Sequence, residues 1–509
     1  DINVAELDRA MASANPGESL SLPTAIGFCM FVSREAWQQA GGFDERYGRG
    51  YGEEVEFCLS TAAQGWDHLL ACDVFVYHAG NISFGYDSEQ LKTDAQKIVD
   101  QRYPDFSRDV QEWIKQDPAL PARLRCDLQR LNPGKGPRIL HVCHALGGGV
   151  LQHVQDLTAA CSAHSDGVNF TLLPWGKNAI SIEAIGGRGE FAMRLPGPDA
   201  EQRLPELLDA LGIQRIHYHH YAGLPQWVLE VPSRLSLPYD VTIHDFVAAC
   251  PQYHFQTSTG RFCGRPSIAG CRACVDERPD EWNLGIEQWR ARFSEHLSGA
   301  ARVICPSQSA AEATTSYYPD SNCVVWPHFD TQTEQFNAHQ TQRPLRIKVA
   351  IVGALSHIKG FELVSAVIRY AEQTDLPLDF VIVGPTIKPL HRETRAAVTG
   401  PYRRELLPDI LVRERPDCFF FASQVPETFN YALSGCMATG LPIVAISCGA
   451  IEERLKDIST ATLLPVDSGV EAVVEALLKQ VHAGAAMTLA TQNISTTAVT
   501  AADYAARDL

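Results

Sequence analysis

The sequence predicts an α/β protein built from two doubly wound, mainly parallel sheets. From Arg138 to about Asp330, short apolar segments alternate with amphipathic segments of helical length, and after a polar connector (331–343) the same alternation starts again. Repeated βα units of this kind produce a parallel sheet with helices on both faces. A chain of 509 residues is also too long for one core. We therefore expect two facing domains that bind ligands at the carboxyl ends of their strands.

The composition excludes several classes of protein. The formal net charge of −17 argues against nucleic acid or an anionic membrane as the main partner. No apolar run approaches the ~20 residues that a transmembrane segment needs, and no signal peptide opens the chain. Most of the 15 cysteines stand singly in apolar segments, and we expect them to be small core residues in a reducing compartment. Examples are Cys29, Cys58, Cys72, Cys143, Cys305 and Cys436.

Before the first alternation lie two other blocks. Residues 1–90 indicate short strands and turns around a glycine-rich centre, and residues 91–136 are charged and helical in pattern. The second block ends in a Pro/Gly/Lys cluster that is typical of a linker. The chain enters the first block in the middle of a pattern, so we expect an upstream part to be missing. The predicted domains are 1–100, a helical linker 101–136, 137–335 and 336–509.

The predicted strands are runs of apolar, β-branched or aromatic residues bounded by turn signals. For the first sheet they are 139–143, 170–173, 215–218, 240–243, 302–305 and 323–326, and for the second 347–352, 378–383, 418–421 and 442–446.

An anion site is predicted where the strand 347–352 ends. The chain turns at Gly353, carries Lys359-Gly360 in the turn and continues into a helix-like segment, 361–372. Free backbone N–H groups and the helix dipole both point at such a turn. The lysine adds a full positive charge for a phosphate.

Two later segments give this turn a context, namely Pro426 to Ser434 and Gly440 to Ala445. Together with the Lys359 turn they resemble the donor-binding half of retaining glycosyltransferases of family 4, which have the GT-B fold of two Rossmann-like domains. The resemblance covers about 137–480. It implies that Lys359 and Gly353 hold the diphosphate of a nucleotide sugar. It also implies that Glu427 faces the transferred sugar, with Thr428 and Ser434 beside the donor.

The sequence departs from the family at one position. The family pattern has a second glutamate that grips the donor ribose, and Gly435 stands there in this chain. Glycine offers no acceptor for ribose hydroxyls and weakens a helix by about 1 kcal/mol relative to alanine. Nucleotide binding is therefore weakened, or rerouted through a neighbour such as Ser434, and loss of activity stays open.

In the first domain, Gly147, Gly148 and Gly149 follow strand 139–143 and precede a helix-like segment. Glycines at a helix N-terminus let a ligand approach the backbone closely, whereas a plain flexible turn is the alternative. The resemblance places this loop over the donor phosphates or the acceptor.

Histidines follow two strands of the first domain and are expected to line its cleft. His244 precedes Asp245, and the resemblance places this histidine close to the transferred sugar, in a positioning role. For His219 and His220, after strand 215–218, cleft and purely structural roles are equally open.

A cysteine-rich insertion, 250–274, follows the His-Asp pair. Its cysteines have the spacing Cys250-x12-Cys263-x7-Cys271-x2-Cys274. Tetrahedral zinc needs four soft ligands, and a Cys-x2-Cys pair supplies two of them from one turn. We predict a structural Zn²⁺ site, with free thiols or an iron site as alternatives.

Residues 24–84 resemble the acceptor-side half of inverting family 2 glycosyltransferases, which have the GT-A fold. The resemblance implies that Glu53 or Glu54 is the catalytic base, and that His78 helps hold the donor's metal (Mg²⁺ or Mn²⁺) in an intact module. A solvated acidic turn is the alternative for the glutamates. The family's nucleotide-binding half is missing from the sequence, so this partial module is expected to be inactive.

These resemblances imply a hexosyltransferase-like enzyme of bacterial-type surface polysaccharide (O-antigen or capsule) biosynthesis. It would transfer sugar from a nucleotide sugar to a glycan or lipid-linked glycan, without a required metal in the GT-B module. We expect a cytoplasmic protein, with peripheral association at the inner membrane face as an option. The alternatives are a degenerate scaffold or carbohydrate-binding subunit and, less favoured because cleft carboxylates are few, a sugar-nucleotide epimerase. The sequence identifies neither donor sugar, acceptor nor linkage.

Overall fold

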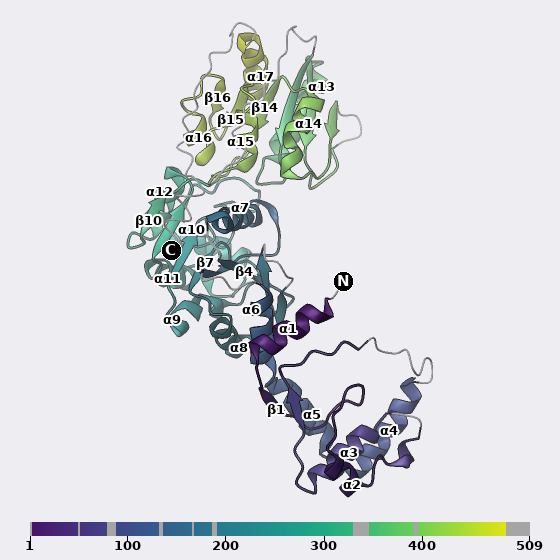
Figure 1. The fold of residues 1–509 in the computed structure, drawn as a ribbon. Helices are drawn as coiled ribbons and strands as arrows, with labels where there is room; N and C mark the ends of the chain where they lie inside the picture. The colour runs from purple at the N-terminus through teal and green to yellow at the C-terminus, as the bar shows by residue number, and fades with distance from the viewer. Residues whose placement is uncertain are drawn as a thin grey trace. The chain divides into compact units, whose positions relative to one another are not determined.

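The computed structural model describes residues 3–48, 51–78, 88–131, 136–164, 167–185, 191–328, 346–390 and 395–484. The chain divides into two compact units. The first contains Asp1–Gly136 with Gly187–Phe191 and Glu206–Gly212, and the second contains the remaining residues, including both large sheets (Figure 1). None of the helices in these described ranges has both the length and the apolar character of a membrane span.

The first unit is mainly helical, which corrects the prediction of strands and turns for residues 1–90. Its helices are α1 (Val4–Ala14), α2 (Arg34–Ala40), α3 (Glu53–Ala62), α4 (Ser88–Arg102), α5 (Phe106–Gln116) and α6 (Leu120–Arg130). Two three-residue strands, β1 (Ser19–Ser21) and β2 (Leu69–Ala71), pair antiparallel. The sequence does contain signals for these helices. The Asn3 side chain accepts a hydrogen bond from Glu6 N and caps α1, and the Ser33 side chain accepts one from Ala36 N and caps α2.

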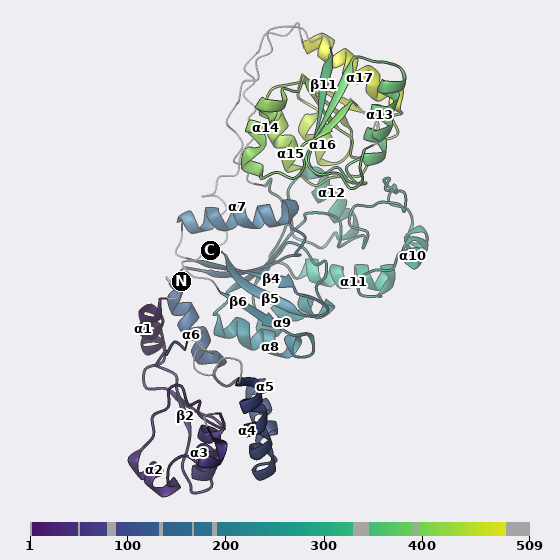
Figure 2. The ribbon, with the colours of Figure 1, turned by 90° about the vertical axis from the view of Figure 1, so that its right-hand side faces the viewer.

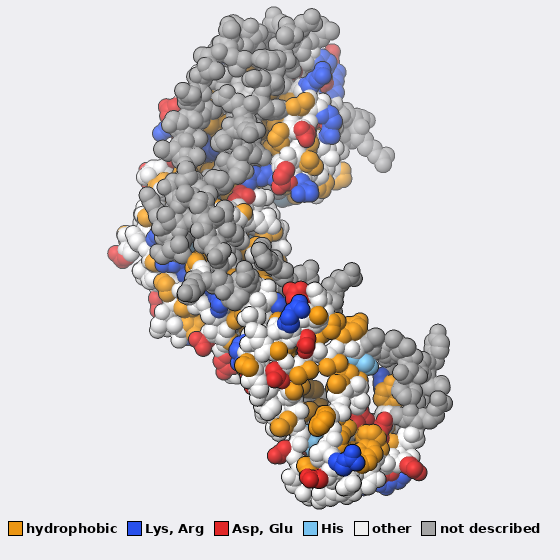
Figure 3. Space-filling view, in the orientation of Figure 1, with side chains coloured by type: hydrophobic (Ala, Val, Ile, Leu, Met, Phe, Trp, Pro, Cys, Tyr) orange, Lys and Arg blue, Asp and Glu red, His pale blue; other side chains and the backbone are white. Residues whose placement is uncertain are grey.

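The surface of the first unit carries many apolar side chains (Figure 3). Those that are exposed include Ile26, Phe28, Phe31, Trp37, Phe43 and Leu69. Cys29 lies in the same region and is exposed as well, so its prediction as a core residue is wrong. It stands in a bend outside any helix or strand. The other cysteines predicted in the core are buried.

The second unit begins with a lobe built on an eight-stranded sheet, here called the first lobe. The strand order is β10-β9-β8-β7-β3-β4-β5-β6. The strands are β3 (Arg138–Val142), β4 (Val168–Pro174), β5 (Ile180–Ile185), β6 (Ala192–Leu195), β7 (Arg215–Tyr218), β8 (Tyr239–Thr242), β9 (Arg302–Cys305) and β10 (Cys323–Val325). The six predicted strands are present and pair in parallel. β5 and β6 were missed, because an antiparallel hairpin needs no helix between its strands and escapes the alternation rule.

Helices follow the strands of the first lobe. They are α7 (Gly148–His164), α8 (Gly197–Ala210), α9 (Val231–Leu235), α10 (Ile268–Glu277), α11 (Gly285–Ser298) and α12 (Gln308–Tyr317). α10 belongs to the cysteine-rich segment and extends beyond the predicted insertion.

The second lobe is built on a six-stranded, fully parallel sheet with the order β13-β12-β11-β14-β15-β16. Its strands are β11 (Ile347–Val352), β12 (Leu378–Val383), β13 (Ala396–Val398), β14 (Cys418–Phe421), β15 (Ile443–Ile446) and β16 (Ala461–Leu464). The four predicted strands are present, and the two edge strands β13 and β16 were missed. The predicted class, an α/β protein with two mainly parallel sheets, is confirmed.

Successive residues of β11 face two different cores of the second lobe. Val349 and Ile351 join the core under α13 (Phe361–Gln373) and α17 (Val470–Gly484). Ala350 and Val352 join the opposite core. That core lies under α14 (Leu407–Glu414), α15 (Tyr431–Met437) and α16 (Ala450–Leu455), as Figure 2 shows. Burial on both faces fixes the sheet, so the loops at the carboxyl ends of β11 and β14 start from rigid positions.

Candidate active site

The structure brings Lys359 and Glu427, 68 residues apart in sequence, into an ion pair. Lys359 lies in the loop between β11 and α13, and Glu427 lies in the connection from β14 to α15. β11 lies between β12 and β14 in the sheet. The strands before β14 in the chain are added on one side of β11 and those from β14 onward on the other, so the strand order reverses here. The crevice outside such a switch point is where open α/β sheets bind ligands. The Lys359 side chain is 36% exposed and the Glu427 side chain 12%, so the lysine is the more accessible partner.

The carboxylate of Glu427 is held from two further sides. Asn430 Nδ2 donates to Glu427 Oε1 at 3.2 Å, while Lys359 pairs with Oε2. On the backbone, Ala450 N donates to Glu427 O at 2.8 Å, and Gly449 pairs with Glu427 in an isolated bridge. A Cβ at Gly449 would lie 2.7 Å from Glu427 O. The position and direction of this carboxylate are therefore set before any ligand arrives.

The lysine loop packs directly on the end of β14. Gly360 has φ +80°, and a Cβ there would lie 2.1 Å from Ala422 O. Only glycine fits so close to a backbone oxygen in the left-handed region. The predicted turn glycine, Gly353, also has positive φ, at +114°.

The remaining residues predicted beside the donor already have protein partners. Thr428 Oγ1 donates to His244 O at 2.6 Å, which joins the second lobe to the first. Ser434 Oγ accepts from Arg454 Nη2 at 2.7 Å, and Gly435 is buried within α15. Sequence reasoning missed Arg454. Its guanidinium also donates to the backbone oxygens of Phe429 and Asn430, and no motif distinguishes it from a surface arginine.

In the first lobe, the glycine loop precedes and begins α7. A Cβ would meet nothing within 4 Å at Gly147 or Gly148, whereas at Gly149 it would lie 3.5 Å from the ring of Tyr431. Tyr431, at the start of α15, also lies close to His153 on α7, with 3.4 Å between Oη and Nδ1. The open glycines therefore lie beside the segment that follows Glu427.

His244 and Asp245 follow β8, and the two uncertain histidines support them. His219 Nδ1 lies 3.2 Å from His244 Nε2, and His220 Nε2 lies 2.9 Å from Asp245 Oδ2. His219 and His220 are almost fully buried. Although burial acts to raise it, the pKa of Asp245 is lowered to about 2, chiefly by His220 and its hydrogen bond. Asp245 is therefore a fixed anion, and the histidines after β7 form a layer behind the predicted cleft residues.

The cysteine-rich segment lies against the lysine loop. It lines a cavity of about 580 Å³ together with residues 356–358 and Glu362. Its own contribution is residues 256–260, and Arg278, just after α10, also lines the cavity. Burial lowers the pKa of His254, and the charge of Lys359 adds to this effect while that of Glu427 opposes it. The sequence predicted the insertion but gave no reason to place it beside the predicted phosphate site.

No three of the predicted zinc ligands, all of which lie in the described ranges, have their sulfur atoms within 4.8 Å of one another. Cys250, Cys263, Cys271 and Cys274 are free and half-buried. Among the described residues, the groups of three whose ligand atoms lie within 4.8 Å of one another consist of histidines alone. Two arginines contact the thiols instead: Arg278 Nη2 lies 2.9 Å from Cys274 Sγ, and Arg290 Nη2 lies 3.2 Å from Cys271 Sγ. The zinc site stays a prediction.

In the first unit, Glu53 and Glu54 lie in the first turn of α3. Glu54 Oε2 accepts from Gly52 N at 3.2 Å, and Glu53 Oε2 is buried without a hydrogen-bond partner. His78 stacks on Phe28, with 4.6 Å between ring centroids, and forms no metal group with the glutamates within the described part of the unit. The predicted roles of these three residues stay predictions.

Comparison with known proteins identifies one part of the chain. Residues 346–482 match the family model of Glycosyl transferases group 1. No curated protein sequence matched.

Similar solved structures include sucrose-phosphate synthase from Thermosynechococcus elongatus, at 16% identity over 72% of this chain and 93% of that one, with a TM-score of 0.46. The catalytic domain of starch synthase IV from Arabidopsis thaliana, bound to ADP and acarbose, has 14% identity over 73% and 95%, with a TM-score of 0.45. HepE from Anabaena, in complex with UDP and glucose, has 15% identity over 72% and 93%, with a TM-score of 0.44.

The matched segment contains the whole six-stranded sheet, the lysine loop and Glu427. This confirms the predicted family resemblance for the second lobe. Residues 346–482 form a group 1 glycosyltransferase domain.

Proposed function

We propose that this chain is a retaining glycosyltransferase that takes its sugar from a nucleotide-sugar donor bound mainly by the second lobe. The observation that carries the proposal is the Lys359–Glu427 ion pair at the switch point of the six-stranded sheet. A cation and an aligned carboxylate side by side match the two ends of the reacting bond in a nucleotide sugar. The lysine suits the diphosphate, and the carboxylate suits the hydroxyls of the sugar.

In this mechanism the donor replaces the carboxylate as the partner of Lys359. The ammonium group then neutralises the negative charge that develops on the departing nucleoside diphosphate, so the leaving group needs no metal. Glu427, released from the lysine but still held by Asn430, accepts hydrogen bonds from the sugar and orients it. His244 and the glycine loop at 147–149 bound the reacting sugar from the first lobe. Catalysis rests on positioning and electrostatics more than on proton transfer.

The finer parts of the proposal rest on sequence resemblance. The acceptor is a growing glycan or lipid-linked glycan of a bacterial-type surface polysaccharide, and the enzyme works in the cytoplasm or at the inner membrane face. Residues 1–100 correspond to part of a GT-A module and 101–136 to a linker. Residues 137–335 are the acceptor-side domain and 336–509 the donor-side domain. The cysteine-rich insertion binds structural zinc.

The test is a nucleotide-sugar panel (UDP, GDP, ADP and dTDP sugars) with binding and nucleotide release as readouts. We expect one base to bind and release its nucleotide, and Lys359→Ala to abolish release while the protein stays folded. Lys388→Ala is the matched control, because this lysine is exposed in the loop after β12 of the same sheet. Near-normal turnover by Lys359→Ala would refute the assignment.

The second candidate is a non-catalytic scaffold or carbohydrate-binding subunit. Two observations favour it: Gly435 provides no side chain for the ribose, and Ser434, its nearest substitute, is already bonded to Arg454. Glycan binding without any nucleotide-sugar binding across the panel would select this candidate.

A further inference from the structure

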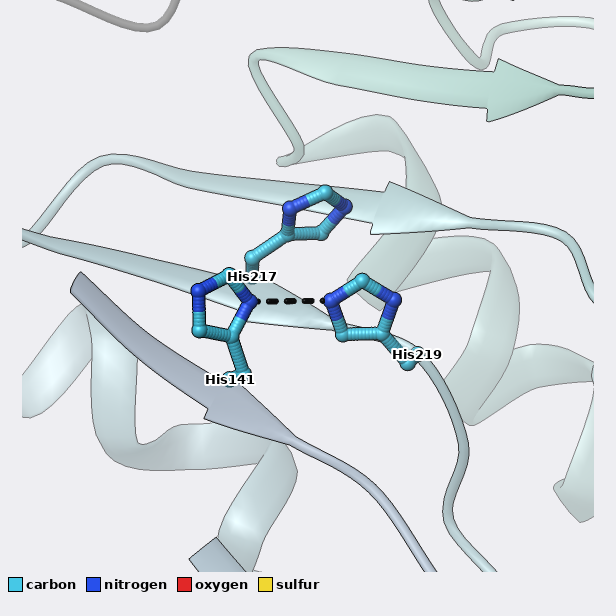
Figure 4. A group of neighbouring side chains, drawn as sticks. All are labelled: His141, His217 and His219. Atoms are coloured by element: carbon cyan, nitrogen blue, oxygen red, sulfur yellow. Dashed lines mark hydrogen bonds between the residues drawn. The ribbon is translucent and has the colours of Figure 1, made fainter. Parts of the chain in front are cut away.

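We propose that His141, His217 and His219 form a binding site for a divalent transition metal of the Zn²⁺ type in the first lobe. The three side chains come from two adjacent strands. His141 on β3 is the register partner of His217 on β7, and His219 follows the end of β7. Figure 4 shows the three rings next to one another, with His141 and His219 facing each other across a hydrogen bond and the ring of His217 beside them. Nothing in the proposed glycosyl transfer requires this cluster.

The geometry is that of a compact three-nitrogen site. One ring nitrogen from each histidine lies within 4.8 Å of the other two. His141 Nδ1 and His219 Nε2 are already 3.1 Å apart. The three residues are between 1% and 2% exposed, so bulk water does not compete for these nitrogens. Zinc–imidazole bonds of about 2.0–2.1 Å require only small movements of the rings from this arrangement.

Each ring also has an outer partner on its second nitrogen. His141 Nε2 donates to Asn169 Oδ1 at 3.0 Å. His217 Nε2 lies 2.8 Å from Thr242 Oγ1, and His219 Nδ1 lies 3.2 Å from His244 Nε2. Metal-binding histidines characteristically use their other nitrogen in this way, which fixes the ring orientation and the tautomer. The candidate ligands for a common ion are therefore His141 Nδ1 and His219 Nε2, which are hydrogen-bonded to each other, and the second nitrogen of His217, Nδ1.

The chemistry of the triad selects the class of ion. Each of the three imidazole rings can offer one nitrogen to an ion. Neutral imidazole suits zinc, copper, nickel and ferrous iron. Mg²⁺ and Ca²⁺ require oxygen ligands, and the triad offers none.

A second triad, His153, His219 and His244, meets the same distance criterion and shares one ligand with the first. We favour the first because all three of its rings have an outer partner. His244 of the second triad, by contrast, is only half-buried, whereas all three histidines of the first are buried. His217 belongs only to the first triad, so a change there distinguishes the two.

Metal binding would reverse the proton arrangement at His244. In the hydrogen-bonded chain, His141 donates to Asn169, so its Nδ1 must accept from His219 Nε2–H, and His219 Nδ1 then accepts from His244 Nε2–H. With a metal on His219 Nε2, the proton moves to Nδ1 and is donated to His244 Nε2. His244 then carries its own proton on Nδ1. Only the relevance of this change to sugar transfer rests on the proposed function.

The experiment measures metal binding by the full chain carrying Cys271→Ser and Cys274→Ser, which disables the predicted thiol site. The protein is stripped with a chelator and titrated with Zn²⁺, or with Co²⁺ as a spectroscopic probe. We expect about one equivalent of tightly bound metal with nitrogen and oxygen ligands only. His217→Phe should lose it. His296→Phe, which removes another buried histidine of the same lobe, should keep it.

X-ray absorption of the zinc-loaded protein with an intact triad tests the same claim without depending on the fold of a histidine variant. Three imidazole ligands are expected. Absence of tightly bound metal, or fewer imidazoles around the zinc, would overturn the proposal. So would equal metal content in folded His217→Phe and His296→Phe.

Discussion

The two lobes of the second unit begin with the same strand–loop–helix unit and use it differently. In the first lobe the loop from β3 to α7 has positive φ at Gly147 and Gly148, with open space around both. In the second lobe the loop from β11 to α13 has positive φ at Gly360, where the backbone presses on Ala422. Open glycines give a ligand access to backbone N–H groups. A packed glycine instead fixes the neighbouring side chain, Lys359, in position.

The side chains next to the two loops also differ, in their charge. Buried histidines lie at the carboxyl ends of β3, β7 and β8, and their pKa values are lowered by burial, so they are neutral. Behind the second loop stands a full ion pair, Lys359 with Glu427. The comparison suggests that the first lobe supplies shape and the second supplies charge, and four experiments test this division.

The largest effect is expected for Gly360→Ala. Its Cβ would lie 2.1 Å from a backbone oxygen, so the loop or β14 must move, and we expect a loss of about 4 kcal/mol in the free energy of unfolding. Gly148→Ala has nearly the same φ, +74°, in open space, and should cost only about 1 kcal/mol. Urea unfolding of both variants measures the difference. Equal losses of unfolding free energy would show that the two glycine positions tolerate a side chain equally well.

Next comes Glu427→Gln, which keeps the shape of the side chain and removes its charge. We expect kcat to fall by about a hundredfold, while donor binding changes by less than about tenfold, because the orienting carboxylate is lost but the lysine remains. Steady-state kinetics with the donor found in the panel separates the two parameters. Glu475→Gln, on the exposed face of α17, is the control and should leave both unchanged.

A smaller effect is expected where the lobes meet. Arg404 Nη1 lies 2.7 Å from Asp156 Oδ2 on α7, and both side chains are largely buried. Arg404→Ala should lower kcat/KM by about tenfold, equivalent to about 1.4 kcal/mol, because the lobes lose a desolvated ion pair. Arg403, its neighbour, is 83% exposed, and Arg403→Ala should change kcat/KM by less than about twofold. Similar losses of kcat/KM in the two variants would show that the ion pair between the lobes does not contribute to activity.

The smallest effect concerns acid sensitivity, which we assign to the first lobe. Burial lowers the pKa of His296 to about 3, below the value of about 6.5 for an unfolded histidine. The unfolded state therefore binds the proton first, and stability is lost as pH falls below about 6.5. In His296→Phe, the loss of unfolding free energy between pH 7 and 5.5 should be smaller than in the native protein by about 1 kcal/mol. Parallel curves of stability against pH would contradict the assignment.

Sequence reasoning reached most of the second lobe, and the reason is physical. Strands buried on both faces are continuous apolar runs, so β11, β12, β14 and β15 could be located directly. The edge strands β13 and β16 are less buried, and they were missed. In the first unit, capping residues such as Asn3 carried the helix signal, but the glycine-rich centre outweighed them.

The candidate site divides along a similar line. Lys359 and Glu427 lie in motifs that can be read locally. The histidine triad forms because β3 lies next to β7, and the order of strands in a sheet cannot be predicted from a local sequence pattern. The same holds for Arg454, and for His254 near the lysine loop. Contacts of this kind depend on the tertiary fold, so no spacing rule could predict them.

The ion pair between Lys359 and Glu427 has a consequence for selectivity. While it is paired with Lys359, the carboxylate of Glu427 neutralises the positive charge of the lysine and so weakens its attraction for other anions. Phosphate or a bare nucleoside diphosphate would compensate the lysine but leave Glu427 with only its hydrogen bond from Asn430. In the proposed function, a nucleotide sugar would present its diphosphate to Lys359 and the hydroxyls of the transferred sugar to Glu427, so the pair would favour the intact donor over the released nucleoside diphosphate.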